Sequence, residues 1–179
     1  MTRLMVFALL LTSLSVEAQP VRIRGVVESF DGKTLVVKDA GSVQVGERTE
    51  LVFTQPIRLA DIRPGDFLGV TSRQAADGKL TAYEVRRFPK PLNPGHRPFD
   101  GGPNQTMTNA SVGTVAKSGG GGDLTLTYDG GSQKVTVPRD AAISELVPGT
   151  AAQLVPGARV NLTHDGNKVA LRVQVSPPQ

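Results

Sequence analysis

The sequence predicts an all-β protein built from two small five-stranded OB-like β-barrels in tandem, preceded by a signal peptide helix. Glycine occurs 20 times and proline 13 times among 179 residues, which is typical of a chain with many turns. Apolar residues alternate with polar ones, as in half-buried strands, and no segment has a long helical period. Similar stretches also recur 88 positions apart, DGKLTAYEV from Asp77 and DGNKVALRV from Asp165, which indicates two copies of one fold.

Residues 1–18 have the pattern of a secretory signal peptide. Arg3 is followed by an apolar run from Leu4 to Leu14, and Val16-Glu17-Ala18 gives the small-x-small end that precedes a cleavage site. The run is shorter than the roughly 18–20 residues of a spanning helix, although a short uncleaved anchor is the alternative. We therefore expect an exported protein of the bacterial periplasm, with no membrane span after the signal peptide is removed.

The first copy, residues 19–92, is predicted to contain five strands. Val21, Ile23, Gly25 and Val27 share one face of the first strand, and Asp31-Gly32 favours a tight turn into a second strand at 34–38. A third strand is expected at 42–53 with an irregularity near residue 46. One helical turn, ended by a Pro-Gly pair at 64–65, precedes strands at 66–72 and 80–88.

The second copy, residues 111–179, follows the same order, with strands expected at 111–117, 123–128, 133–137, 158–163 and 168–175. The glycine run at 119–122 is interpreted as a hairpin tip, because it lacks the Gly-Lys-Ser/Thr end of a phosphate-binding loop. In the last strand, the pattern places Val169, Leu171, Val173 and Val175 on the inward face. Five strands with a helical turn between the third and fourth is the order of an OB-type barrel. Two open sheets or one continuous β-sandwich are the alternatives.

Residues 93–110 are predicted to link the two barrels, because proline and glycine interrupt the segment repeatedly. The segment also holds a cluster of chemically active side chains, His96, Arg97, Phe99 and Asp100. Clefts between domains are frequent ligand sites, so these four residues are the candidate binding residues. Arg97 would pair with an anionic group, Asp100 would orient Arg97, and His96 would add pH sensitivity. The alternative is a packed tether with no ligand.

Other chemistries have little support in the sequence. Cysteine is absent, which excludes disulfides, thiol catalysis and cysteine-bound metals. The two histidines form no HxH, HxxxH or HExxH motif, and His164 beside a turn is interpreted as a surface residue. No Gly-x-Ser-x-Gly motif occurs. Aromatic residues make up only 4% and the net charge is a modest +4, so nucleic-acid binding is not expected. We predict no catalytic residue, no metal site and no cofactor.

Three stretches in order, LADIRPGDFLGV, LTAYEVRRFP and GHRPFDGGPNQTMTNASV, resemble a group of uncharacterised exported bacterial proteins. These proteins carry OB-like domains of the DUF5666 type, and the resemblance extends over the mature chain. The resemblance implies the fold and the compartment. This sequence departs from the family pattern at Arg86, Lys90 and Phe99, where the family has a histidine, an acidic residue and a tryptophan, respectively. Since some relatives have names that mention metal transport, these departures argue against such a role here.

The sequence thus favours an exported, non-enzymatic binding or interaction module of the cell envelope. Its expected partner is a small anionic ligand or an envelope protein. A structural envelope or stress-related protein without a small ligand is the main alternative, and a metal-binding protein or an enzyme is less favoured.

Overall fold

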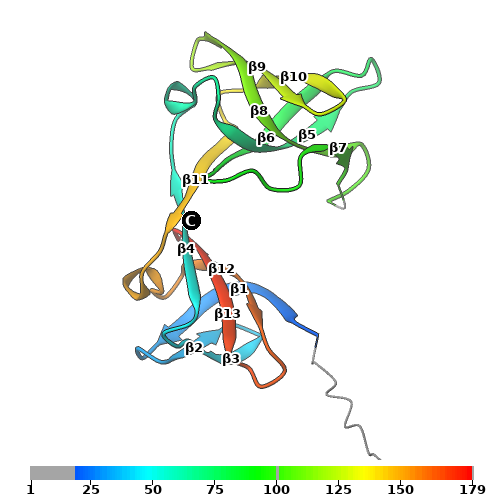
Figure 1. Ribbon diagram of the computed structural model, residues 1–179. Helices are drawn as coiled ribbons and strands as arrows, with labels where there is room; N and C mark the ends of the chain where they lie inside the picture. Colours follow the sequence, from blue (N-terminus) through cyan, green and yellow to red (C-terminus); the bar gives the residue numbers. More distant parts are fainter. Residues whose placement is uncertain (1–18, 100, 179) are drawn as a thin grey trace, which may run out of the picture.

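The computed structural model describes residues 19–99 and 101–178, and the predicted signal peptide lies outside this range. The described chain is all-β, with two 3₁₀ turns as its only helical elements (Figure 1). The strands are β1 (Val21–Phe30), β2 (Thr34–Val37), β3 (Gly41–Gln44), β4 (Glu50–Pro56), β5 (Phe67–Gln74), β6 (Leu80–Phe88), β7 (Gly95–Pro98), β8 (Gln105–Ser118), β9 (Gly121–Tyr128), β10 (Gly131–Val137), β11 (Ala142–Pro148), β12 (Arg159–His164) and β13 (Ala170–Ser176). The 3₁₀ turns are η1 (Leu59–Asp61) and η2 (Ala151–Gln153).

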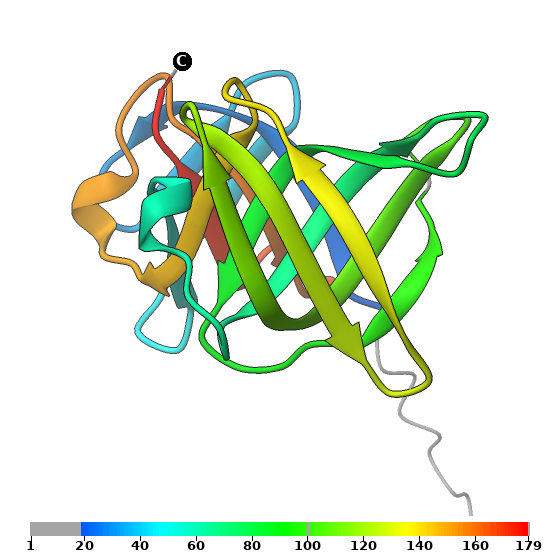
Figure 2. The same ribbon diagram turned by 90° about the horizontal axis from the view of Figure 1, so that it is seen from above.

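Five strands close into a barrel, which we call the barrel lobe. Around the ring, β5 pairs with β8, β8 with β9, β9 with β10, β10 with β6, and β6 with β5. Figure 2 shows this lobe with its strands steeply inclined. Its core contains residues from both halves of the chain, including Leu68, Val85, Leu124 and Leu126, all fully buried. Burial of several such side chains supplies most of the driving force for closing the lobe.

The curved lobe is formed by the strand order β13-β12-β1-β2-β3. Its two edge strands meet at a single parallel bridge between Gln44 and Val169. A separate core fills it, with Leu35, Val37, Leu162 and Val173 among its fully buried residues. This second core is also shared between the two halves of the chain.

Each lobe therefore combines the first three strands of one half of the sequence with the last two strands of the other half. This exchange differs from the predicted boundaries 19–92, 93–110 and 111–179, which gave each half its own barrel. Alternation of apolar residues identifies the face of a strand that is buried, but it does not identify the neighbouring strand. Whether the two halves are copies of one ancestral fold stays a prediction.

Two strands connect the lobes at the waist of the molecule (Figure 1). β4 and β11 pair antiparallel with each other, while β4 runs parallel to β13 and β11 runs parallel to β6. The side chain of Arg87 on β6 helps to fix this junction. Its guanidinium pairs with Glu145 on β11 at 2.5 Å and with Asp66 at 3.3 Å. Its hydrogen bond to the Glu145 carboxylate raises the pKa of Arg87, so the guanidinium stays charged throughout the physiological range.

The predicted turns agree with the structure. Asp31 Oδ1 accepts hydrogen bonds from the backbone N–H groups of Lys33 and Thr34, and Gly32 has a φ of 98°. Gly119 and Gly120 form the tip of the β8–β9 hairpin with positive φ angles, as a tight turn requires. The predicted third strand is interrupted between Gln44 and Glu50, on either side of the expected irregularity.

The predicted orientation of the last strand is wrong in its first half. A β-bulge opposite Thr163 and His164 shifts the pairing, so that Arg172 faces Thr163 while Ala170 faces His164. The extra residue, Leu171, is 47% exposed, whereas Ala170 is buried. A bulge reverses the alternation on one side of it, and the apolar pattern alone does not reveal it.

The predicted linker is mostly ordered β structure. Its residues 95–98 form β7, which pairs with β8, and its end forms the start of β8. The Asn109 side chain holds the preceding loop, since its Nδ2 donates to the carbonyl oxygens of Leu92 and Asn93 at 2.9 and 3.2 Å. The chain between the halves is thus part of the sheet.

Candidate functional site

One continuous face of the sheet runs from the barrel lobe over the connecting strands β11 and β4 to the curved lobe. The two lobes stand on either side of this face. Since side chains alternate along a strand, residues that are opposite one another in register share a face. From β6 to β11 to β4 to β13, this face carries Arg86, Ser144, Pro56 and Thr54, and Gln174. Gln174 Nε2 donates a hydrogen bond to Thr54 Oγ1 at 3.1 Å, which links β13 to β4. Pockets on this face therefore have walls from both lobes.

The first of them, which we call the basic pocket, has a volume of about 630 Å³. One wall comes from β1, β12 and β13 of the curved lobe, and the other from β6, β8 and Phe99. Its lining residues are Arg24, Gly25, Val26, Glu84, Arg86, Phe99, Met107, Arg159, Val160, Asn161, Gln174 and Ser176. Three arginines and one glutamate make this pocket electropositive, and apolar side chains stand beside the charges.

The charges of the basic pocket are only partly balanced. Arg86 pairs with Glu84, the single carboxylate of the lining. Arg86 Nε is buried and has no hydrogen-bond partner among the described residues. Arg24 and Arg159 make no ion pair within residues 19–99 and 101–178. An anion in this pocket would meet the two uncompensated guanidinium groups of Arg24 and Arg159.

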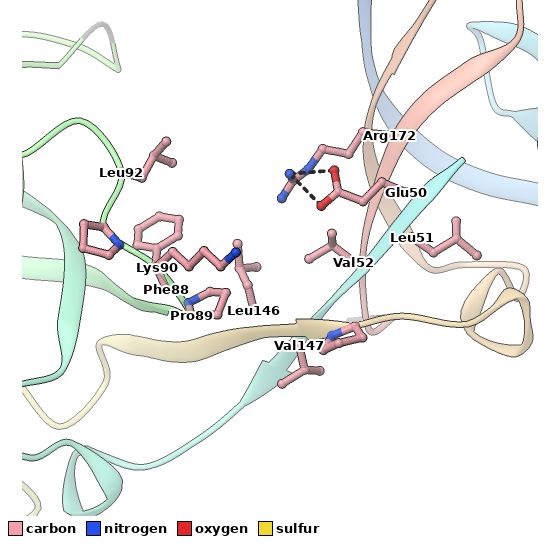
Figure 3. Close-up of a pocket in the computed structure, with 12 residues that line it drawn as sticks. Glu50, Leu51, Val52, Phe88, Pro89, Lys90, Leu92, Leu146, Val147 and Arg172 are labelled. Carbon is pink, nitrogen blue, oxygen red and sulfur yellow. Dashed lines mark hydrogen bonds and ion pairs between the residues drawn. The ribbon is translucent and has the colours of Figure 1, made fainter. Parts of the chain in front are cut away.

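A second pocket, the apolar pocket, lies farther along the same face and has a volume of about 470 Å³ (Figure 3). Figure 3 shows Phe88 and Leu92 on one side, and Arg172 paired with Glu50 on the other. Arg172 Nη1 donates to both carboxylate oxygens of Glu50, at 3.0 and 3.1 Å. Lys90 also lines this pocket and makes no ion pair among the described residues, so the pocket combines a mainly apolar lining with one ammonium group.

The structure separates the predicted site residues. His96 Nδ1 lies 2.8 Å from Thr108 Oγ1, and Arg97 Nη1 donates to the Asn93 carbonyl oxygen at 3.1 Å. Neither residue lines the basic pocket or the apolar pocket, whereas Phe99 lines the basic pocket. Asp100 lies outside the described residues. The segment thus contributes its aromatic side chain to the interlobe face, while its Arg97 stabilises the β6–β7 loop.

His96 should make the stability of the protein depend on pH. Partial burial lowers its pKa below the ordinary value of 6.5, because the imidazolium is poorly solvated there. The unfolded chain therefore binds a proton more readily, and the free energy of unfolding should fall as pH drops below about 6.5. Urea unfolding between pH 8 and 5 would measure this. The His96→Gln variant should show a smaller loss than the wild type over the same range, and equal losses would contradict the assignment.

The arginines of the basic pocket were not among the candidates from the sequence. Arg22 and Arg24 alternate with the inward residues of β1. From this pattern the sequence predicts only that the two arginines face solvent. Arg86 and Arg159 come from other strands, and the register that brings all of them together depends on the strand exchange. The available signal was the alternation of arginines on one strand, without any indication of what faces it.

His164 is buried at the end of β12, so its interpretation as a surface residue is wrong. Its Nδ1 contacts the carbonyl oxygen of Asp165.

Within the described residues, no three His, Asp or Glu side chains come together in a way that would hold a metal ion. That part of the chain also contains no helix with the length and apolar character of a membrane span. Comparison with protein-family models, curated proteins and solved structures found no match to this chain.

Proposed function

We propose that the protein is an exported, non-enzymatic binding module of the bacterial cell envelope that holds an anionic ligand between its two lobes. The observation that carries this proposal is the basic pocket, where Arg24 and Arg159 from one lobe face Arg86 from the other. The compartment is part of the proposal and rests on the leader-like pattern of residues 1–18. The resemblance to DUF5666-type proteins is consistent with it.

The chemistry of the lining favours a carboxylate, phosphate or sulfate group over a neutral ligand. Guanidinium groups bind such anions through charge-assisted hydrogen bonds, often two at a time. Phe99 and Met107 would cover an apolar part of the ligand beside the anionic group. The same lining lacks a histidine or a second carboxylate that would pair with Glu84 in acid–base catalysis, which favours binding over reaction.

Thermal unfolding with small anions tests this proposal. Succinate and inorganic phosphate, each at tens of millimolar against sodium chloride of equal ionic strength, should raise the melting temperature of the wild type. The double variant Arg24→Gln/Arg159→Gln should lose that rise, since it removes both unpaired guanidinium groups. The matched control is Arg48→Gln/Arg63→Gln, which removes the same charge from exposed positions outside the basic pocket. If both double variants respond as the wild type does, the basic pocket is not the anion site.

A further inference from the structure

The start of β1, residues 21–24, presents an open backbone edge. Residues 21–26 pair with β12 on one side, whereas β2 pairs only with the later part of β1. Val26 O accepts a hydrogen bond from Lys38 N on the β2 side, and Val27 N donates to Ala158 O on the opposite side. Backbone groups of an extended strand alternate in direction, so those of Arg22 and Arg24 point with Val26 towards the open edge. Within the described residues, no strand pairs with Arg22 or Arg24 along that edge.

The same molecule shows what covers the corresponding edge in the other lobe. β8 also begins with residues that precede its pairing with the next strand, β9. There the short extended segment Gly95–Pro98 pairs antiparallel with residues 106–109 of β8. An extended strand thus completes the barrel lobe, while the matching position beside β1 is empty among the described residues.

The side chains around this edge define the chemistry of an added strand. Arg24 and Val26 line the basic pocket, and Arg22 lies on the same face of β1 two residues earlier. Phe99 stands on the opposite side of that pocket. A strand placed along β1 would therefore have one row of side chains beside the arginines and Phe99. Acidic side chains in that row would neutralise the charges that the lining leaves unpaired.

We propose that β1 accepts an extended acidic peptide segment of a partner protein, which adds to the curved lobe as a further strand. This inference rests on the proposed function and names the ligand of that site. Backbone hydrogen bonds to Arg22 and Arg24 would supply the geometry, as in other cases of strand addition. The arginine side chains would select acidic residues at alternate positions of the peptide.

The test uses a capped seven-residue peptide of alternating valine and glutamate, titrated by calorimetry. A second peptide has the same sequence with N-methyl groups on every second residue, and a third has them on the other residues. Only one of these methylated peptides blocks the N–H groups that would face β1. It should bind at least tenfold more weakly than the parent, and the other should bind as the parent does.

Two variants of the protein separate the backbone from the charge. Arg24→Gln keeps the backbone N–H and should weaken the parent peptide severalfold. Arg24→Pro also removes that N–H, which points away from β12, and should weaken it further while circular dichroism shows retained β structure.

The outcomes distinguish the two proposals. If succinate and the parent peptide bind but both methylated peptides bind equally well, strand addition is wrong and the anion site stands. If neither succinate nor any peptide binds, the proposed function itself fails.

Discussion

Cutting the chain between β6 and β7 should leave a single particle that contains both fragments. A protease site placed in residues 90–94 would divide the protein into β1–β6 and β7–β13. These fragments share the pairs β1–β12, β4–β13, β5–β8 and β10–β6, and both cores take residues from each. Separating them would expose two hydrophobic cores, so neither fragment keeps the burial that stabilises its lobe.

Size-exclusion chromatography with light scattering measures this outcome. The cleaved protein should elute with the mass of the intact chain in buffer, and as two smaller species in 6 M guanidinium chloride. Two barrels, each formed by one half of the sequence, would instead separate after cleavage without denaturant. That separation would contradict the strand exchange directly.

Truncating Leu162 should cost about 2–5 kcal/mol of unfolding free energy, the usual range for a fully buried leucine changed to alanine. Leu162 on β12 is 1% exposed and packs in the core of the curved lobe with residues of β1, β2 and β13. Its removal leaves a cavity that is lined by both halves of the chain. Urea denaturation of Leu162→Ala should show the loss as a lower midpoint with an unchanged slope.

Leu171→Ala is the matched control on the neighbouring strand. The same change of side chain at an exposed bulge position should alter the unfolding free energy by no more than about 0.5 kcal/mol. The sequence pattern alone makes Leu171 a core residue, so equal losses in the two variants would support the pattern and contradict the bulge.

Local features of the fold follow from the sequence because they depend on neighbouring residues. The turn at Asp31-Gly32 needs a carboxylate and a residue that tolerates positive φ, and both are visible in the sequence. The 3₁₀ turn at 59–61, before Pro64, is likewise a local property. Strand pairing is not local, since several strands of equal length and similar alternation compete for each partner. The exchange between the halves and the bulge at Leu171 therefore emerged only from the structure.

The candidate site shows the same division. The sequence pattern selected the segment around Phe99, and Phe99 lines the basic pocket. Its role in binding stays a prediction. The sequence also predicted an anion-binding role for Arg97, whose guanidinium donates to a carbonyl oxygen of its own loop and does not line the basic pocket. Arg24, Arg86 and Arg159 lie on three different strands, and only tertiary pairing brings them to one pocket. A row of exposed arginines on a strand identifies a charged face, but not the surface opposite it.

The strand exchange also constrains the order in which the chain acquires its structure. Val21 near the start of the described chain pairs with His164 near its end, so the curved lobe is incomplete until almost the last residue is available. Contacts of such high sequence separation slow folding, because the entropy of closing long loops is lost before the contacts form. A chain of which only the amino-terminal part is available could not complete the curved lobe, because β1 would lack its partner strand β12. It would remain loosely structured until its carboxyl end is available, because β12 and β13 complete the curved lobe.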